Sequence, residues 1–62
     1  MYDLVIKAYN GINVIKFSNV DKAIEAFKAF CDDYKVMDSM ELLNHTDHGI
    51  VHIMKLEVMN HD

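Results

Sequence analysis

The sequence of 62 residues has no proline, two glycines and a single cysteine. Because the chain has no proline- or glycine-rich stretch, it contains no recognisable linker, and we expect one folded domain over residues 1–62. A single cysteine excludes a disulfide within the chain, and Cys31 lies among apolar residues at helical spacing, which is typical of a core residue. A chain this short buries only about 60% of its unfolded surface, so we expect a partner or a metal to add stability.

Basic residues are also few, with 6 Lys and Arg against 10 Asp and Glu and a formal net charge of −4. Direct nucleic-acid binding is therefore not expected, because a protein that follows the phosphate backbone needs a basic stripe. No apolar run approaches the roughly 18 residues of a membrane span, and no signal-peptide pattern begins the sequence. We expect a cytoplasmic protein without membrane contact, and a partner with a basic surface.

Apolar side chains repeat at three- and four-residue intervals over residues 18–34, the spacing of an amphipathic helix. They are Val20, Ala23, Ile24, Phe27, Phe30, Cys31 and Tyr34. Ser18 or Asn19 is the expected N-cap, and Ser18 with Asp21 resembles a weak capping box. The opposite face of this helix is charged and carries Asp21, Lys22, Glu25, Lys28, Asp32 and Asp33.

Residues 2–9 and 12–17 are predicted strands separated by Asn10-Gly11, a strong hairpin signal because a type I′ turn needs positive φ at both central residues. A two-residue loop at this place pairs Tyr9 with Ile12, and alternation then separates the two faces. The face that receives the helix carries Leu4, Ile6, Ala8, Ile15 and Phe17. The second face carries Val5, Lys7, Tyr9, Ile12, Val14 and Lys16. This second face is more apolar than solvation requires, so we expect it to be covered.

Residues 35–44 and 49–59 are predicted strands on either side of a polar hairpin loop, residues 45–49. A short helix from Asp38, with Glu41 at its third position, is the alternative for residues 36–43. In the last strand, alternation places Ile50, His52, Met54, Leu56 and Val58 on one face. The other face of that strand carries Val51, Ile53, Lys55, Glu57 and Met59.

These elements predict an α+β fold of ββαββ order, a four-stranded, mostly antiparallel sheet in the order 2-1-3-4 with one helix on one face. A single helix leaves the other face or an edge strand free, and methionines at 37, 40, 54 and 59 give an adaptable apolar surface. We therefore expect a homodimer. The predicted dimer or sheet-face contacts are Val5, Tyr9, Ile12, Val14, Val51 and Ile53.

Residues with catalytic or metal-binding chemistry are sparse. His45, Asp47 and His48 are weak metal candidates, whereas His48 and His52 on one strand lie about 13 Å apart and cannot share an ion. No serine or cysteine has a base-and-orienter arrangement, and the two glycines form no phosphate-binding loop. We expect no cofactor and no enzymatic activity.

The candidate partner-binding residues are Asp21, Glu25, Asp32, Asp33, Asp38 and Glu41. They form either an acidic recognition surface or an ordinary solvated face, and the apolar sheet face is the alternative recognition surface. In size and composition alone, the chain resembles small accessory proteins of bacteriophages, including inhibitors of host enzymes and of defence systems. That resemblance implies an interaction module that binds and blocks a macromolecular partner. Two alternatives stay open: a small-ligand or metal-binding domain using residues 45–52, and a structural subunit of an assembly.

Overall fold

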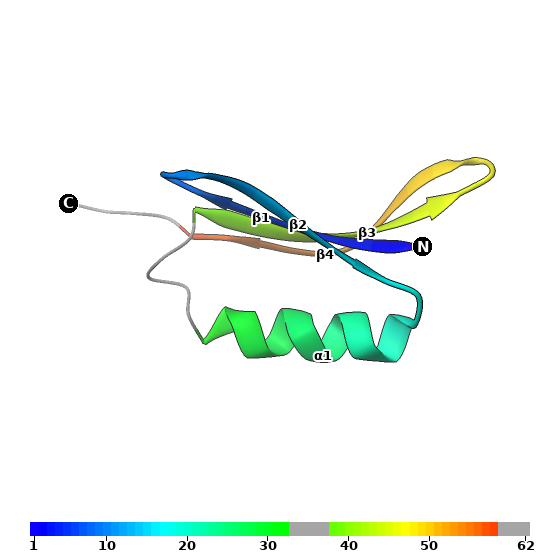
Figure 1. Ribbon diagram of the computed structural model, residues 1–62, viewed down its shortest axis with the longest axis horizontal. Helices are drawn as coiled ribbons and strands as arrows, with labels where there is room; N and C mark the ends of the chain where they lie inside the picture. Colours follow the sequence, from blue (N-terminus) through cyan, green and yellow to red (C-terminus); the bar gives the residue numbers. More distant parts are fainter. Residues whose placement is uncertain (33–37, 59–62) are drawn as a thin grey trace.

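The computed structural model describes residues 1–32 and 38–58. Its elements are β1 (Tyr2–Ala8), β2 (Gly11–Phe17), α1 (Val20–Cys31), β3 (Ser39–Thr46) and β4 (Gly49–Glu57). The strands form one antiparallel sheet in the order β2-β1-β3-β4, and α1 lies along one side of it (Figure 1). The predicted α+β class, ββαββ order and strand order are confirmed, and strand is the correct alternative for the described part of residues 36–43.

The helix is shorter than the predicted residues 18–34, beginning at Val20 and ending at Cys31. Asn19 is the N-cap, because its side-chain oxygen accepts hydrogen bonds from the backbone N–H groups of Asp21 at 2.8 Å and Lys22 at 3.3 Å. Asp32 is the C-cap, and its backbone N–H donates to the carbonyl of Ala29 at 3.3 Å. Asp33 and Tyr34 lie outside the described residues.

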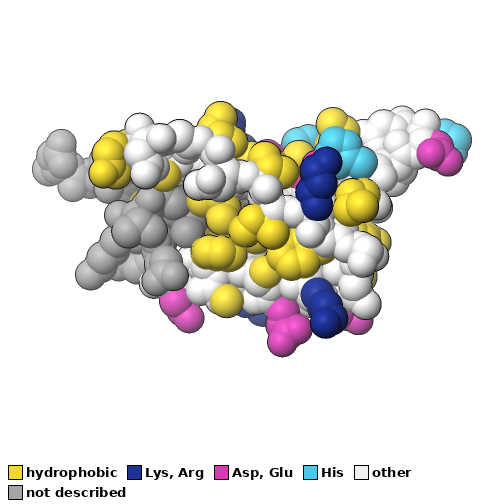
Figure 2. All heavy atoms as spheres, viewed as in Figure 1, with side chains coloured by type: hydrophobic (Ala, Val, Ile, Leu, Met, Phe, Trp, Pro, Cys, Tyr) yellow, Lys and Arg dark blue, Asp and Glu magenta, His cyan; other side chains and the backbone are white. Residues whose placement is uncertain are grey.

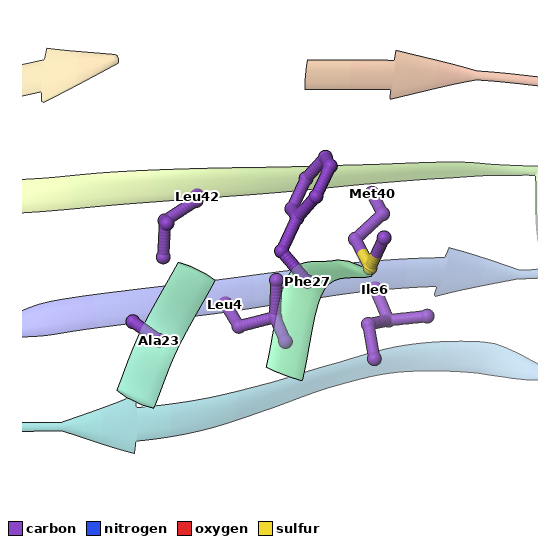
Figure 3. Packing of buried hydrophobic residues seen from close by; sticks show 6 residues of the cluster. All are labelled: Leu4, Ile6, Ala23, Phe27, Met40 and Leu42. Atoms are coloured by element: carbon purple, nitrogen blue, oxygen red, sulfur yellow. The ribbon is translucent and has the colours of Figure 1, made fainter. Parts of the chain in front are cut away.

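The core is a single layer between α1 and the two central strands. It consists of Leu4 and Ile6 from β1, Met40 and Leu42 from β3, and Ala23 and Phe27 from α1. Figure 3 shows the side chains of Ala23 and Phe27 among those of the two central strands. Cys31 and residues of the edge strands pack half-buried around this cluster. The helix therefore covers the middle of the sheet most fully.

The first hairpin turns one residue earlier than the sequence indicates, which shifts the pairing of β1 with β2 by two residues. Ala8 pairs with Gly11, so the loop consists of Tyr9 and Asn10, and the predicted pairing of Tyr9 with Ile12 is wrong. The reason is conformational: among the described residues positive φ occurs only at glycine, with Gly11 at 141°, so Asn10 cannot form the predicted type I′ turn. A shift of two residues preserves side-chain alternation, and the predicted faces of β1 and β2 are correct.

The second hairpin also turns in two residues, Asp47 and His48, rather than in the predicted loop of residues 45–49. Gly49 adopts a φ of 127° and pairs with Thr46. The Thr46 hydroxyl accepts a hydrogen bond from the backbone N–H of His48 at 3.2 Å and donates to the carbonyl of Gly49 at 2.9 Å. His45 and Thr46 are consequently the last residues of β3, and the hairpin extends past the helix (Figure 1).

A β-bulge interrupts the pairing of β3 with β4. Leu42 pairs with Met54 and Leu43 with His52, which leaves Ile53 without a partner residue. Because Ile53 is an extra residue, the side chains of β4 before it point to the opposite faces from those that regular alternation predicts. The predicted grouping of His52 with Met54 on one face is therefore wrong. Met54 remains on the helix side, while His52 joins the opposite face.

Truncating Phe27 to alanine removes the largest side chain of the core and leaves a cavity between α1 and the sheet. We expect the free energy of unfolding to fall by about 3–5 kcal/mol, a large part of the roughly 3–9 kcal/mol typical of a chain this size. Urea denaturation followed by circular dichroism measures the change. Lys28→Ala at the adjacent exposed position is the control and should stay within about 0.5 kcal/mol; an equal effect of both variants would contradict this packing.

Gly49→Ala tests the positive φ of the second hairpin. A Cβ atom at Gly49 would meet nothing within 4 Å, so its cost is purely that of the backbone conformation. We expect a loss of about 1–3 kcal/mol of unfolding free energy in urea titrations. His48→Ala, one residue earlier and without positive φ, should change stability by less than about 0.5 kcal/mol. If Gly49→Ala leaves the midpoint of urea denaturation unchanged, the turn does not need a positive φ at residue 49 and the prediction is wrong.

Candidate functional site

The face of the sheet opposite α1 has no covering element in the part of the chain that the structure describes, and we call it the open face. Strand pairing and alternation define its members. They are Asp3, Val5, Lys7, Ile12, Val14, Lys16, Ser39, Glu41, Leu43, His45, Ile50, His52, Lys55 and Glu57. In Figure 2, hydrophobic, basic and histidine side chains lie side by side along the upper part of the molecule, away from α1.

Apolar side chains on the open face are unusually exposed. Ile12 is 63% exposed, Val14 51% and Ile50 55%. Val5 and Leu43 lie half-buried beside them and do not belong to the core cluster. Single exposed apolar residues are ordinary on a protein surface, but several on one uncovered sheet face are typical of a contact surface.

Asp3 and His45 form the first of two carboxylate–histidine pairs on the open face. His45 Nε2 lies 2.7 Å from Asp3 Oδ2. The Asp3 side chain is only 13% exposed, and its second oxygen, Oδ1, is buried with no hydrogen-bond partner among the described residues. Lys16, which pairs with Asp3 across β1 and β2, adds a positive charge on the same face. The sequence offers one signal for Asp3, since alternation from Val5 places it on this face.

Glu41 and His52 form the second pair, through His52 Nδ1 and Glu41 Oε2. The bulge at Ile53 makes this contact, because it turns His52 to the face that Glu41 occupies. The sequence predicts a half-buried His52 on the face of Met54, whereas its side chain is 67% exposed. Glu41 was predicted to join the acidic residues near the helix, but it lies on the opposite side of the sheet.

Lys55 and Glu57 make the third charged contact on the open face, with Nζ 2.9 Å from Oε1. The hydrogen bond from Lys55, followed by its charge, lowers the pKa of Glu57 below 4.5. The same hydrogen bond, with the charges of Glu57 and Glu41, raises the pKa of Lys55 above 10.5. Both side chains are solvent-exposed, so the pair contributes little stability and mainly sets the charge pattern of β4.

The weak metal candidates are not brought together. His45 turns toward Asp3, while Asp47 and His48 form the exposed turn of the second hairpin. Among the described residues, no three histidine, cysteine or carboxylate side chains gather as a metal site would require.

The acidic residues predicted to bind a partner fall on separate surfaces. Asp21, Glu25 and Asp32 follow one exposed line along α1, with Lys28 inside the same line. We call these four residues the helix stripe; Figure 2 shows acidic side chains, with a basic one among them, along the edge where α1 lies. Asp38 is exposed just before β3, and its backbone N–H donates to the carbonyl of Lys7 at 2.7 Å. Asp33 lies outside the described residues.

The predicted sheet-face contacts are divided by the two hairpins. Val5, Ile12 and Val14 lie on the open face as expected. Tyr9 lies in the first turn and is 92% exposed. Placing Val51 on one face with Lys55 and Glu57 is wrong, because Val51 pairs with Asn44 on the helix side; Ile53 is the bulged residue between the two halves of β4.

The described residues enclose no pocket, and α1 is neither long nor apolar enough to cross a membrane. No protein-family model, curated protein or solved structure matches the chain at a significant level. The surfaces of the chain themselves are therefore the basis for a functional proposal.

Replacing Lys55 by glutamine should raise the pKa of Glu57 back toward 4.5, because it removes the ammonium that holds the carboxylate ionised. The Lys55–Glu57 pair stabilises the folded chain slightly at pH values above the ordinary pKa of glutamate. This stabilisation is lost as the pH falls through the lowered pKa of Glu57. Carboxyl-detected NMR titration of Glu57 measures the shift. Lys22→Gln on the helix is the matched control and should leave the pKa of Glu57 unchanged. If Glu57 titrates identically in the wild type and in both variants, the Lys55–Glu57 contact is absent in solution.

Proposed function

We propose that this chain is a non-enzymatic protein-interaction module that binds a macromolecular partner in the cytoplasm and blocks the surface it occupies. The open face is the observation that supports this proposal. Small-molecule sites are concave, whereas an extended sheet face with exposed Ile12, Val14 and Ile50 suits contact with another protein surface. The proposed mode of action is that of the blocking proteins found among phage accessory proteins.

The arrangement of residues on the open face supports a protein contact. Val5 and Val14 pair near its middle, and charged side chains surround them, among them Asp3, Lys7 and Lys16. Interfaces between proteins have an apolar centre and a polar rim, in which the centre supplies most of the affinity and the rim selects the partner. The open face has both parts within a single sheet.

The helix stripe supports a second contact, with a basic surface. Asp21, Glu25 and Asp32 are exposed along α1, and Lys28 leaves a net charge of minus two on the stripe. A negative surface speeds the association of a positively charged partner, and salt weakens this effect. Because α1 lies on the opposite side of the sheet from the open face, the two surfaces are free to act at the same time.

Capture from a lysate of the cells that naturally contain this protein tests the proposal. Immobilised wild-type protein is compared with Val14→Lys on the open face and with the triple variant Asp21→Asn, Glu25→Gln, Asp32→Asn on the stripe. We expect a specific protein that the wild type retains and that at least one of the two variants loses by about tenfold or more, as for charge changes within an interface. Mass spectrometry identifies it, and circular dichroism checks that the variants remain folded.

Val51→Lys is the control for the open-face variant. Val51 is 52% exposed and Val14 is 51% exposed, and both lie on edge strands, but Val51 is on the helix side of the sheet. If no protein is retained above the background of an unrelated acidic domain, the proposed function is wrong. Equal retention by the wild type and both surface variants would likewise reject these surfaces as the binding sites.

A further inference from the structure

We propose that the open face binds a second copy of this chain, so that two sheets stack face to face and the two helices lie on the outside. This inference rests on the proposed function only in taking the open face as a contact surface. Three independent features of the open face favour a second copy as the occupant: its charge balance, the symmetry of its charge pattern and its size.

The open face is neutral, although the chain as a whole is acidic. Lys7, Lys16 and Lys55 balance Asp3, Glu41 and Glu57 when the histidines are neutral. The formal charge of −4 therefore belongs to the rest of the chain. Two copies that meet through any acidic surface repel one another, whereas two open faces meet without net repulsion.

The charges of the open face are arranged about its apolar middle in a pattern that matches itself. Asp3 and Lys7 lie two residues before and two residues after Val5 on β1. A two-fold axis that lies in the interface, perpendicular to the strands and near Val5, places Asp3 of each copy opposite Lys7 of the other. Such an isologous contact forms every favourable pair twice.

The same axis extends this match to the edge strands. Val14, the cross-strand partner of Val5, meets Val14 of the second copy and joins the two valine pairs in one apolar centre. On β4, His52 and Glu57 lie on either side of Lys55, so His52 faces Glu57 of the second copy. Glu41 and its cross-strand partner Lys55 each come near their own counterparts, and the carboxylates and ammonium groups of the two residues lie beside one another across β3 and β4.

The size of the face is consistent with a reversible dimer. Four strands about 4.8 Å apart and seven residues long at about 3.3 Å per residue give roughly 440 Å² per copy in projection, or close to 900 Å² for both. Stable interfaces bury about 1,200–2,000 Å² of accessible surface. Because side chains protrude from the sheet, the accessible area of the open face is larger than its flat projection and comes near the lower end of that range. We therefore expect a dissociation constant in the micromolar range, on the order of 1–100 μM.

Sedimentation equilibrium of the untagged full chain tests the proposal over about 1 μM to 1 mM, where dimers of this strength appear. The wild type should be a dimer at the upper end, and Val14→Lys should remain a monomer because it places two lysines opposite one another on the two-fold axis. Val51→Lys, with the same exposure on the other side of the sheet, should dimerise like the wild type. Circular dichroism establishes that each variant is folded.

A second matched pair tests the charge pattern. Lys7→Glu places an acid opposite Asp3 twice and should weaken the dimer by at least about tenfold, whereas Lys22→Glu makes the same charge change on the exposed face of α1 and should not. In a dimer of mixed isotope labelling, filtered NOEs should connect methyl groups of Val5 and Val14 between copies. NOEs from Val51 or from α1 instead would place the contact elsewhere and overturn the proposal.

The outcomes separate this inference from the proposed function. A wild-type protein that stays monomeric to about 1 mM, or a Val14→Lys variant that dimerises as well as the wild type, overturns the second copy as occupant. If that monomer still captures a protein that Val14→Lys loses, the open face binds a different partner and the proposed function stands. A dimer that captures nothing supports this inference and removes the proposed partner binding.

Discussion

The packing of one helix against one face of the sheet is the constraint on which the rest of this structure depends. A helix of 12 residues is about 18 Å long and 10 Å wide, while four strands span about 19 Å across. Phe27 and Ala23 consequently reach Leu4 and Leu42 on the central strands, and β2 and β4 contribute only half-buried side chains. The chain has no second layer among its described elements, so none of them covers the other face of the sheet.

The bulge at Ile53 decides what that open face contains. Without it, alternation would direct His52 toward the helix and Val51 toward the open face. The extra residue exchanges them, so that an ionisable side chain meets Glu41 outside the core and a valine near the hairpin tip faces the helix side. A single unpaired residue in β4 thus avoids placing an imidazole beside the helix and brings that imidazole to Glu41 on the open face.

Much of the fold follows from local patterns that the sequence displays. The amphipathic spacing around Phe27 predicts the helix, and two glycines in polar surroundings mark both hairpin turns. The register of the first hairpin does not follow, because Asn10-Gly11 is compatible with two loop positions and only the backbone conformation at Asn10 distinguishes them. The Ile53 bulge carries no local mark, since isoleucine fits a regular strand equally well. The site was therefore less predictable than the fold: Val5, Ile12 and Val14 followed from alternation, whereas the contact of His52 with Glu41 required the bulge.

Charged groups on the open face restrict how it associates. A face of valine and isoleucine alone would adhere in many registers, whereas charges of both signs favour the arrangements that bring the most opposite charges together. Asp3 is the most constrained of these groups, since its side chain is mostly buried, His45 contacts one oxygen and the other has no hydrogen-bond partner among the described residues. A further positive charge near a buried carboxylate with one unpaired oxygen is stabilising, because it offsets the loss of hydration. Lys7 of a second copy supplies that charge in the proposed dimer, so the least satisfied group of the monomer selects the same two-fold arrangement as the charge pattern.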